Sequence, residues 1–411
     1  SQATPQRPDT GSSVAPVVMT TGAPCVRGLG TSIAPLRRAM FRQALLVAAA
    51  LALVPPALAA GPSVDARAYL VEDGRTGEVL LARNEARQVP IASLTKMMTV
   101  LLALERARLT DEVTVTPHAA AVGESSVNLR AGERLTVRDL VEASLIQSAN
   151  DAAWALAEHV GRGDSDSFVS MMNRRARALG LADTNFVRPD GLDATGHVSS
   201  ARDVTTLARI LMQKPVVRKI VAMRDATIEG GRRLHTWNDL LGTFPGVVGV
   251  KTGHTTAAGW SEVAAVRGPG VTVYATVIGS PGRSIRNDDL VELMKWGLAR
   301  FRVVSLISTG RVYARAETPY DREQVSLVAP RAVRRAVLAD RPLVERVVAP
   351  TSVELPVREG QELGEVRVYD RGKVVARSPL VAARSAEEPS TIGRAGWYVG
   401  RAAENMWGWV T

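Results

Sequence analysis

Three short polar motifs follow one another along this chain, and their residue types indicate nucleophilic catalysis. The first holds Ser93 and Lys96, the second holds Ser148 and Asn150, and the third is a Lys-Thr-Gly run that begins at Lys251. A serine hydroxyl is a weak nucleophile unless a base lies within hydrogen-bond reach, and a lysine with a neutral amine can be that base. We therefore expect Ser93 to be a nucleophile and Lys96 to be its base.

The scarcity of lysine supports this interpretation. Only six of the 51 basic residues are Lys, yet Lys96 and Lys251 are two of those six. Arginine cannot accept a proton, because its guanidinium stays charged in proteins. Burial in the apolar run 97–104, together with a second cation nearby, would lower the pKa of Lys96. The alternative is a surface serine beside a solvated lysine, which that apolar run disfavours.

Local patterns predict the elements that position these residues. Positions 92–105 read as an apolar helix, so Ser93 and Lys96 would share one face near its start. A capping box at Thr136 and Asp139 begins another helix, and the second motif lies in the connection after it. The first of several β-branched strands ends at the third motif. We expect a hairpin at 68–81, helices at 92–105, 136–147, 151–160, 167–179, 200–213 and 288–301, and strands at 247–251, 261–266 and 271–278.

Longer blocks around the motifs resemble the serine-type D-alanyl-D-alanine carboxypeptidases, the low-molecular-mass penicillin-binding proteins of peptidase family S11. The resemblance runs from about residue 65 to 383, and its blocks are 91–99, 147–152, 191–193, 199–203 and 250–255. It implies an α/β (α+β) catalytic domain of the β-lactamase/transpeptidase-like type, with a mostly antiparallel sheet, flanking helices and a helical subdomain. A small all-β domain would follow. We expect the catalytic domain at 62–305 and the β-rich domain at 308–383.

The resemblance implies an acyl-transfer reaction. Ser93 would attack the carbonyl between the two terminal D-alanines of a peptidoglycan stem pentapeptide, D-alanine would leave, and water would hydrolyse the Ser93 ester. β-Lactams would acylate the same serine as inhibitors. Neither a metal nor a cofactor is implied. The catalytic residues would be Ser93, Lys96, Ser148, Asn150 and Lys251, and the substrate-binding residues would be Thr252, Gly253, His254 and Arg286.

The resemblance also assigns roles within this set. Ser148 would relay a proton between Lys96 and the leaving amine, and Asn150 would hold Lys96 and the substrate amide. The backbone N–H groups of Ser93 and His254 would form the oxyanion hole. A helix-cap pair is the alternative for Ser148 and Asn150, because both residue types are common caps.

The third motif and a nearby arginine would hold the end of the substrate. A strand edge can pair with an extended peptide, Gly253 allows a close backbone approach, and Thr252 offers a hydroxyl to the terminal carboxylate. The resemblance implies that Arg286, counted back from the matched Trp296-Gly297, is the arginine for that carboxylate. Arg283 competes for the role, and an ordinary surface arginine is the remaining alternative.

Two other functions compete with the carboxypeptidase. A class A β-lactamase uses a Glu downstream of the second motif for deacylation, and this chain has no Glu between His159 and Ile228. The other competitor is a catalytically silent wall-binding or sporulation protein on the same fold. The complete set of motifs argues against it.

The N-terminal region reads as an export signal. Residues 40–59 have a basic start, an apolar core and an Ala-Leu-Ala cleavage motif at 57–59, which predicts a secretory signal peptide. An uncleaved anchor is the alternative. Residues 1–39 would be a disordered extension or the result of a start codon assigned too early. Because Cys25 is the only cysteine and precedes the cleavage motif, the mature chain would have no disulfide, Cys nucleophile or Cys-zinc site.

Charge and the last residues predict the surroundings of the protein. The net charge is +10, but the Arg residues are scattered and no nucleic-acid motif appears, so an anionic wall or lipid surface is the better partner. Residues 390–411 would form an amphipathic helix on the outer face of the cytoplasmic membrane. A helix packed on its own domain is the alternative. The residues behind this expectation are Ile392, Val399, Ala403, Met406 and Val410, with Trp397, Trp407, Trp409, Arg394 and Arg401.

Overall fold

A computed structural model describes residues 61–321 and 323–407 of the chain. The expected signal peptide, the segment 1–39 with Cys25, and residues 408–411 of the expected tail helix lie outside the described residues. The description below therefore begins at the first strand of the sheet.

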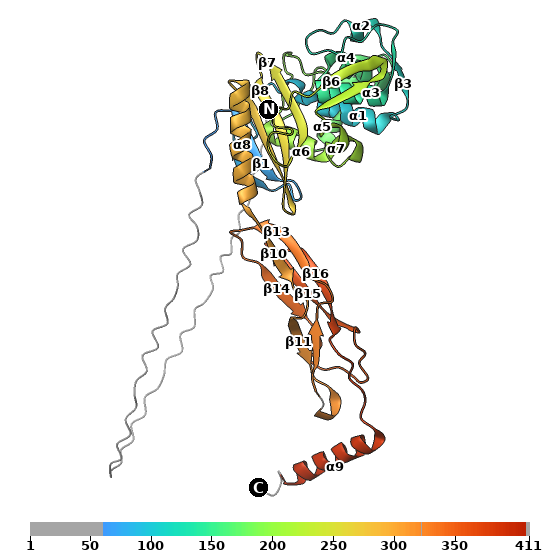
Figure 1. The fold of residues 1–411 in the computed structure, drawn as a ribbon, viewed down its shortest axis with the longest axis vertical. Helices are drawn as coiled ribbons and strands as arrows, with labels where there is room; N and C mark the ends of the chain where they lie inside the picture. Colours follow the sequence, from blue (N-terminus) through green and yellow to red (C-terminus); the bar gives the residue numbers. More distant parts are fainter. Residues whose placement is uncertain (1–60, 322, 408–411) are drawn as a thin grey trace, which may run out of the picture. The chain divides into compact units, whose positions relative to one another are not determined.

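The motif-bearing part is built on a five-stranded antiparallel sheet (Figure 1). The strand order is β2-β1-β9-β8-β7. All six residues of β1 are buried, as expected of an inner strand with both faces covered, whereas β7 lies at an edge of the sheet. The strands are β1 (Ala68–Asp73), β2 (Val79–Arg83), β7 (Val247–Thr255), β8 (Gly259–Gly268) and β9 (Val271–Ser280).

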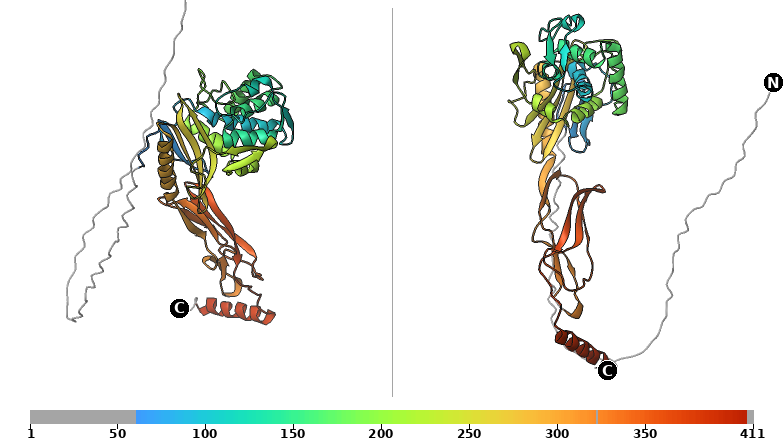
Figure 2. Two further views of the ribbon diagram at one scale, coloured as in Figure 1. Left: turned by 45° about the horizontal axis from the view of Figure 1, so that its top comes forward. Right: turned by 90° about the vertical axis from the view of Figure 1, so that its right-hand side faces the viewer.

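Helices cover both faces of this sheet (Figures 1 and 2). On one face α8 (Arg283–Ala299) packs Leu290, Leu293 and Met294 against the strands. On the other face α6 (Ala201–Leu211) packs against the strands, α1 (Lys96–Arg106) packs on α6, and α4 (Asn150–Val160) packs on α1. Shorter elements complete this region: β3 (Glu112–Thr114), α2 (Pro117–Ala120), β4 (Arg134–Thr136), α3 (Val137–Glu142), α5 (Ser165–Ala178), α7 (Pro215–Ile220), β5 (Asp225–Ile228) and β6 (Arg232–His235).

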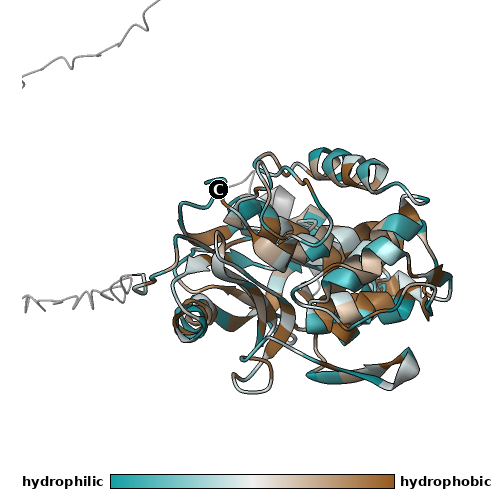
Figure 3. Ribbon diagram, turned by 90° about the horizontal axis from the view of Figure 1, so that it is seen from above, coloured by the Kyte–Doolittle hydropathy of each residue, from teal (hydrophilic) through white to brown (hydrophobic). Residues whose placement is uncertain are grey.

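Helix α1 is the buried centre of the helical region. Every residue from Lys96 to Ala103 is buried, which explains the unbroken apolar run after the first motif. Figure 3 shows hydrophobic residues along the sheet and on the helices beside it. A lysine at the first position of such a helix is held away from water, so its charge must be compensated or given up.

The chain after α8 is rich in strands. A two-stranded sheet pairs β10 (Phe301–Ile307) with β13 (Val333–Leu338). A five-stranded sheet has the order β11-β12-β16-β15-β14 and encloses its own apolar cluster. Its strands are β11 (Val312–Ala316), β12 (Val325–Val328), β14 (Val344–Val348), β15 (Glu362–Asp370) and β16 (Lys373–Ala382). The expected fold class, a helix-flanked antiparallel sheet followed by an all-β region, is confirmed.

Three element boundaries differ from the prediction and matter for the site. Helix α8 begins at Arg283 and not at 288, because extended Gly282 precedes it directly. Both candidate arginines therefore lie in its first turn. Strand β7 continues to Thr255, since it pairs with β8 along its length. The first motif begins in a 3-10 turn, Ala92–Thr95, and α1 starts only at Lys96.

The last described element is helix α9 (Thr391–Trp407). Its residues Ile392 and Val399 are 84% and 70% exposed. Within residues 61–321 and 323–407, none of the helices combines the length and the apolar character that crossing a membrane requires.

Candidate active site

The first motif places a hydroxyl and an amine side by side. Ser93 lies in the 3-10 turn that leads into α1, after Ala92, whose backbone is left-handed with φ 49°. Lys96 is the first residue of α1, and its Nζ lies 2.8 Å from Ser93 Oγ. The expected face shared by Ser93 and Lys96 is therefore present, with the two groups at hydrogen-bond distance.

Lys96 is fully buried among oxygen atoms. Its Nζ donates to Asn150 Oδ1 at 2.7 Å and to the backbone carbonyl of Asp190 at 2.6 Å, besides its contact with Ser93. Burial lowers the pKa of Lys96 to about 8, against the opposing effect of the Asp190 carboxylate. About a tenth of the molecules would then hold a neutral amine at pH 7. A neutral Nζ can accept the proton of the Ser93 hydroxyl.

The second motif connects the two buried lysines. Lys251 Nζ donates to Ser148 Oγ at 2.8 Å and to the carbonyl of Thr252 at 2.7 Å. Burial lowers the pKa of Lys251 well below its ordinary value, and the neighbouring Lys96 lowers it further. Neither Ser148 nor Asn150 caps the N-terminus of α4 with its side chain, so the cap alternative is wrong for that helix. Both side chains face the lysines.

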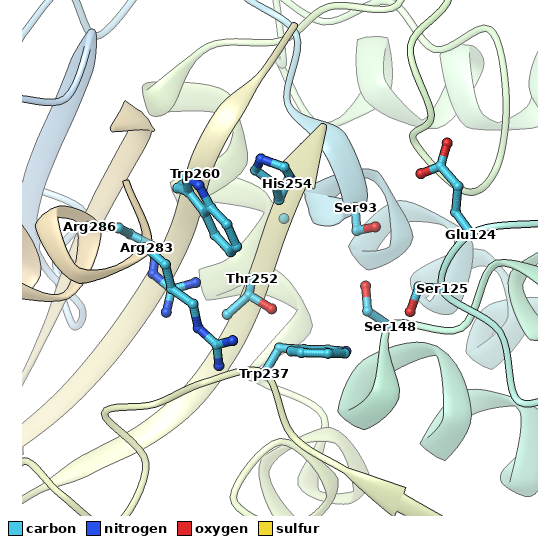
Figure 4. A pocket seen from close by; sticks show the side chains of 11 residues that line it. Ser93, Glu124, Ser125, Ser148, Trp237, Thr252, His254, Trp260, Arg283 and Arg286 are labelled. Atoms are coloured by element: carbon cyan, nitrogen blue, oxygen red, sulfur yellow. The ribbon is translucent and has the colours of Figure 1, made fainter. Parts of the chain in front are cut away.

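Strand β7 brings its backbone against the nucleophile. A Cβ added at Gly253 would lie only 3.0 Å from the Ser93 amide nitrogen, so a side chain here would crowd the backbone of the nucleophile. Thr252 and His254 line the same cavity as Ser93 and Ser148 (Figure 4). The His254 ring is stacked on Trp260 with 4.1 Å between centroids. An edge strand beside a serine can hold an extended peptide in place for attack.

Both candidate arginines line the cavity, on the side away from Ser93 (Figure 4). Arg286 is 1% exposed and forms ion pairs with Asp239 at 3.0 Å and Glu262 at 3.2 Å. Arg283 holds Asp239 with two nitrogens, at 2.8 and 2.6 Å. The alternative of an ordinary surface arginine is wrong for Arg286. The two arginines give this end of the cavity a positive character.

Sequence reasoning missed the carboxylate behind Arg286. Glu262 is fully buried in β8, and within the described part of the chain neither of its oxygens accepts a hydrogen bond. Burial raises its pKa to about 7 even though the Arg286 guanidinium opposes the shift. The available signal was a charged residue directly before a run of four apolar residues, 263–266, in β8. Four further residues line the cavity without having been predicted: Glu124, Ser125, Trp237 and Trp260.

A neutral histidine fixes the loop behind the first motif. The backbone N–H of Val187 donates to Nδ1 of His197 at 2.9 Å, so Nε2 carries the hydrogen and donates to Thr95 Oγ1 at 2.8 Å. Burial lowers the pKa of His197 to about 4, so the ring stays neutral near neutral pH. The same loop supplies the Asp190 carbonyl that binds Lys96. His197, which had no predicted role, thus helps to position the base.

Comparisons with known proteins agree with this geometry. A family model described as D-alanyl-D-alanine carboxypeptidase, Peptidase_S11, matches residues 56–282. D-alanyl-D-alanine carboxypeptidase DacD of Salmonella typhimurium is 33% identical over 387 residues, or 88% of this chain and 97% of that protein. The crystal structure of penicillin binding protein 6B from Escherichia coli is 30% identical, with a TM-score of 0.61 over 80% of this chain and 98% of that one.

A further solved structure is that of penicillin-binding protein D2 from Listeria monocytogenes in the ampicillin-bound form. It is 32% identical, has a TM-score of 0.53 and covers 57% of this chain and 99% of its own. The matched family region includes all three motifs and extends to Gly282. This chain therefore belongs to the D-alanyl-D-alanine carboxypeptidase family, peptidase family S11.

Proposed function

We propose that this protein is a serine-type D-alanyl-D-alanine carboxypeptidase that trims peptidoglycan stem pentapeptides. The observation that carries the proposal is the fully buried Lys96 amine, 2.8 Å from the Ser93 hydroxyl, with a pKa lowered to about 8 by burial. The site thereby joins a nucleophile to a base that can be neutral. Membership of the family supplies the substrate class.

Acylation begins with the peptide along the edge of β7. Its terminal carboxylate lies toward Thr252 and the arginine end of the cavity, where the charges are complementary. Ser93 Oγ attacks the carbonyl between the two D-alanines, and its proton passes to Lys96. The N–H groups of Ser93 and His254 stabilise the oxyanion.

Collapse of the tetrahedral intermediate breaks the peptide bond. The proton held by Lys96 passes through the Ser148 hydroxyl to the leaving amine, and D-alanine departs. Lys251 fixes Ser148 for this relay, because its Nζ lies 2.8 Å from Ser148 Oγ. A water molecule then attacks the Ser93 ester with Lys96 as base, which releases the shortened peptide and restores the serine.

A β-lactam would acylate Ser93 by the same first step, and the ring-opened product would remain attached. A class A-like β-lactamase is the second candidate for this site, and a silent wall-binding protein is the third. The chain has no Glu between His159 and Ile228 that could serve as the deacylation base of a class A enzyme. The carboxypeptidase therefore accounts for the site better than either competitor.

D-alanine release from a stem pentapeptide tests the function directly. Ser93→Ala should abolish both D-alanine release and covalent labelling by fluorescent penicillin while the protein stays folded. Wild-type protein should give a lasting labelled band, a β-lactamase a transient one, and a silent protein none. Release of D-alanine by Ser93→Ala, or a transient band for the wild type, would contradict the proposal.

We further propose how the protein reaches its substrate. The segment 40–59 would direct export, so N-terminal sequencing of secreted protein should start near residue 60. The catalytic domain would span 62–305, the β-rich domain 308–383, and the segment 390–411 would hold the enzyme on the outer face of the cytoplasmic membrane. Mature protein that still contains Cys25 would contradict the export proposal.

A further inference from the structure

The cavity carries opposite charges on the two sides of the nucleophile. Arg283 and Arg286 line one side, and Glu124 lines the other, with Ser93 and Ser148 between them (Figure 4). Among the described residues that line this cavity, Glu124 is the only one with a carboxylate. The arginine side suits the terminal carboxylate of the proposed substrate, but that role leaves the acidic side unexplained.

The Glu124 carboxylate is available to a ligand. Its residue is exposed, and within the described part of the chain its side chain has neither a hydrogen bond nor an ion pair. The two cations whose pKa its charge affects, Arg188 and Lys96, already have other partners. Arg188 holds Asp190 with two nitrogens, at 2.6 and 2.8 Å, and Lys96 Nζ already has three oxygen partners.

The backbone holds Glu124 at a fixed place on the rim. Asn150 of the second motif binds both of its neighbours: Nδ2 donates to the Gly123 carbonyl at 3.0 Å, and the backbone N–H donates to the Ser125 carbonyl at 2.7 Å. Glu124 itself has φ 62°, a conformation in which glycine or asparagine is more usual. A long acidic side chain therefore occupies a strained position that is anchored to the catalytic centre.

The orientation of the substrate determines what meets this carboxylate. When the terminal carboxylate of an extended peptide lies toward the arginines, the rest of the peptide extends from Ser93 in the opposite direction. Its length increases by about 3.4 Å per residue. The residue that precedes the two D-alanines is the next one along that direction. A carboxylate at the rim recognises a cationic side chain by charge and hydrogen bonding.

We propose that Glu124 selects stem peptides in which the residue before the two D-alanines carries a free ammonium group. The inference rests on the proposed carboxypeptidase function and adds the chemistry of the residue at that position. A stem peptide whose amine is acylated by cross-linking would lose this contact. The enzyme would thus prefer stems that have not been cross-linked through that amine.

A different role for Glu124 predicts a different result. Its negative charge also raises the pKa of Lys96 through space. If that were its only role, Glu124→Gln would shift the pH profile and change the turnover of every substrate by the same factor. Recognition of an ammonium group changes only the ratio between substrates that have and lack the amine.

The test uses the mature chain and two peptides, Nα-acetyl-Lys-D-Ala-D-Ala with its ε-amine free or acetylated. For the wild type, kcat/KM for D-alanine release should be about three- to tenfold higher with the free amine, the range for an exposed charge-assisted contact. Glu124→Gln should bring the ratio near one. The control is Glu112→Gln, which removes another exposed carboxylate, on β3 and outside the cavity, and should keep the wild-type ratio.

Charge reversal and salt sharpen the test. Glu124→Lys should prefer Nα-acetyl-Glu-D-Ala-D-Ala over the lysine peptide, and the wild-type preference should weaken as ionic strength rises. An equal turnover of both lysine peptides by the wild type, or an equal loss on both in Glu124→Gln, would overturn the inference and leave the carboxypeptidase intact. No release of D-alanine from either peptide would instead refute the proposed function, and the inference with it.

Discussion

Two lysine side chains buried side by side dominate the chemistry at the scale of single residues. Lys96 and Lys251 are 0% and 2% exposed. The motifs supply their oxygen acceptors, except for the Asp190 carbonyl, which also binds Lys96. Burial lowers the pKa of both amines, and the charge of Lys96 lowers the pKa of Lys251 further. Arginine at either position would keep its charge, which explains why an Arg-rich chain retains Lys here.

The first prediction follows from the lowered pKa of Lys96. Acylation needs the neutral amine, so its rate should rise about tenfold per pH unit below pH 8 and level off above it. The measurement is the second-order rate constant for acylation by penicillin between pH 5.5 and 9.5. Lys96→Arg should remove the reaction across this range, because its guanidinium does not release a proton.

Glu262 supplies the control for that profile, because its pKa of about 7 lies within the same range. Glu262→Gln removes this titration and should leave the rise toward pH 8 in place. A flat profile between pH 6 and 8 would contradict Lys96 as the base. Loss of the rise toward pH 8 in Glu262→Gln would contradict it too, because the rise would then belong to Glu262.

The second prediction concerns the buried pair of Arg286 and Glu262. Arg286→Ala removes a charge-assisted contact and should lower kcat/KM for a carboxylate-bearing pentapeptide about 10- to 100-fold. It also leaves Glu262 buried without its partner, which should cost about 3 kcal/mol of folding stability. Arg283→Ala, on a more exposed side chain, should be milder in both respects. Kinetics and thermal unfolding measure the two effects.

The double variant Arg286→Ala/Glu262→Leu separates stability from binding. It should regain thermal stability relative to Arg286→Ala but should not regain activity on the carboxylate substrate. A C-terminally amidated substrate should be poor for the wild type and lose little more in Arg286→Ala. If Arg283→Ala shows this pattern and Arg286→Ala does not, the carboxylate site belongs to Arg283.

At the scale of elements, local signals predicted what local sequence determines. The capping box is present, with Thr136 and Asp139 each bonded to the other's backbone N–H. The predicted strand ended at residue 251, because glycine is uncommon in strands and Gly253 follows closely. Pairing with β8 extends β7 to Thr255. Glu262 was missed because its partner, Arg286, is distant in sequence.

Backbone groups of the site are also invisible to sequence reasoning. The Asp190 carbonyl is one of three acceptors for the Lys96 amine, and any residue type could supply it. Its position depends on the loop around Gly191, which packs against the 3-10 turn of the nucleophile. The sequence contains Gly191, but only the fold shows that Ala92 lies beside it and leaves no room for a side chain.

The third prediction tests that packing. Gly191 has φ 88°, and a Cβ there would lie 2.0 Å from the Ala92 carbonyl oxygen. Gly191→Ala must therefore displace the loop, and it should lower both acylation by penicillin and the melting temperature. Gly180→Ala is the matched control, because its φ is also positive, at 74°, but nothing lies within 4 Å of its Cβ.

Gly180→Ala should cost about 1 kcal/mol from backbone strain alone and retain acylation. A comparable loss of acylation in both variants would show that strain, and not the contact with Ala92, accounts for the effect. Measurement of the acylation rate and the melting temperature on the same preparations distinguishes the two causes.

At the scale of the whole molecule, the chemistry and the tail use different parts of the chain. The residues that line the cavity lie between Ser93 and Arg286, and the β-rich strands have an apolar cluster of their own. Helix α9 bears Ile392 and Val399 seven residues apart, so both lie on one face, and both are exposed. An exposed apolar face on a helix with Arg394 suits an anionic membrane surface.

The fourth prediction is that the segment 390–411 binds membranes and is dispensable for catalysis. Deletion of this segment should release active enzyme from vesicles that contain anionic lipid, and added salt should weaken binding of the full mature chain. Ile392→Ser/Val399→Ser should weaken co-sedimentation with the vesicles as well. Val374→Ser, at an exposed valine of β16, should bind like the wild type.

A helix packed on its own domain would behave differently, and two ring contacts with Tyr320, from Trp397 and Tyr398, favour that alternative. The Trp397 ring meets Tyr320 with 5.4 Å between centroids. If α9 served only to make these contacts, deletion of 390–411 would lower the melting temperature or the activity, and the truncated protein would show the same vesicle binding as the full chain. The exposed Ile392 and Val399 favour the membrane hypothesis. Packing through Trp397 leaves both side chains in water, whereas a lipid surface would bury them.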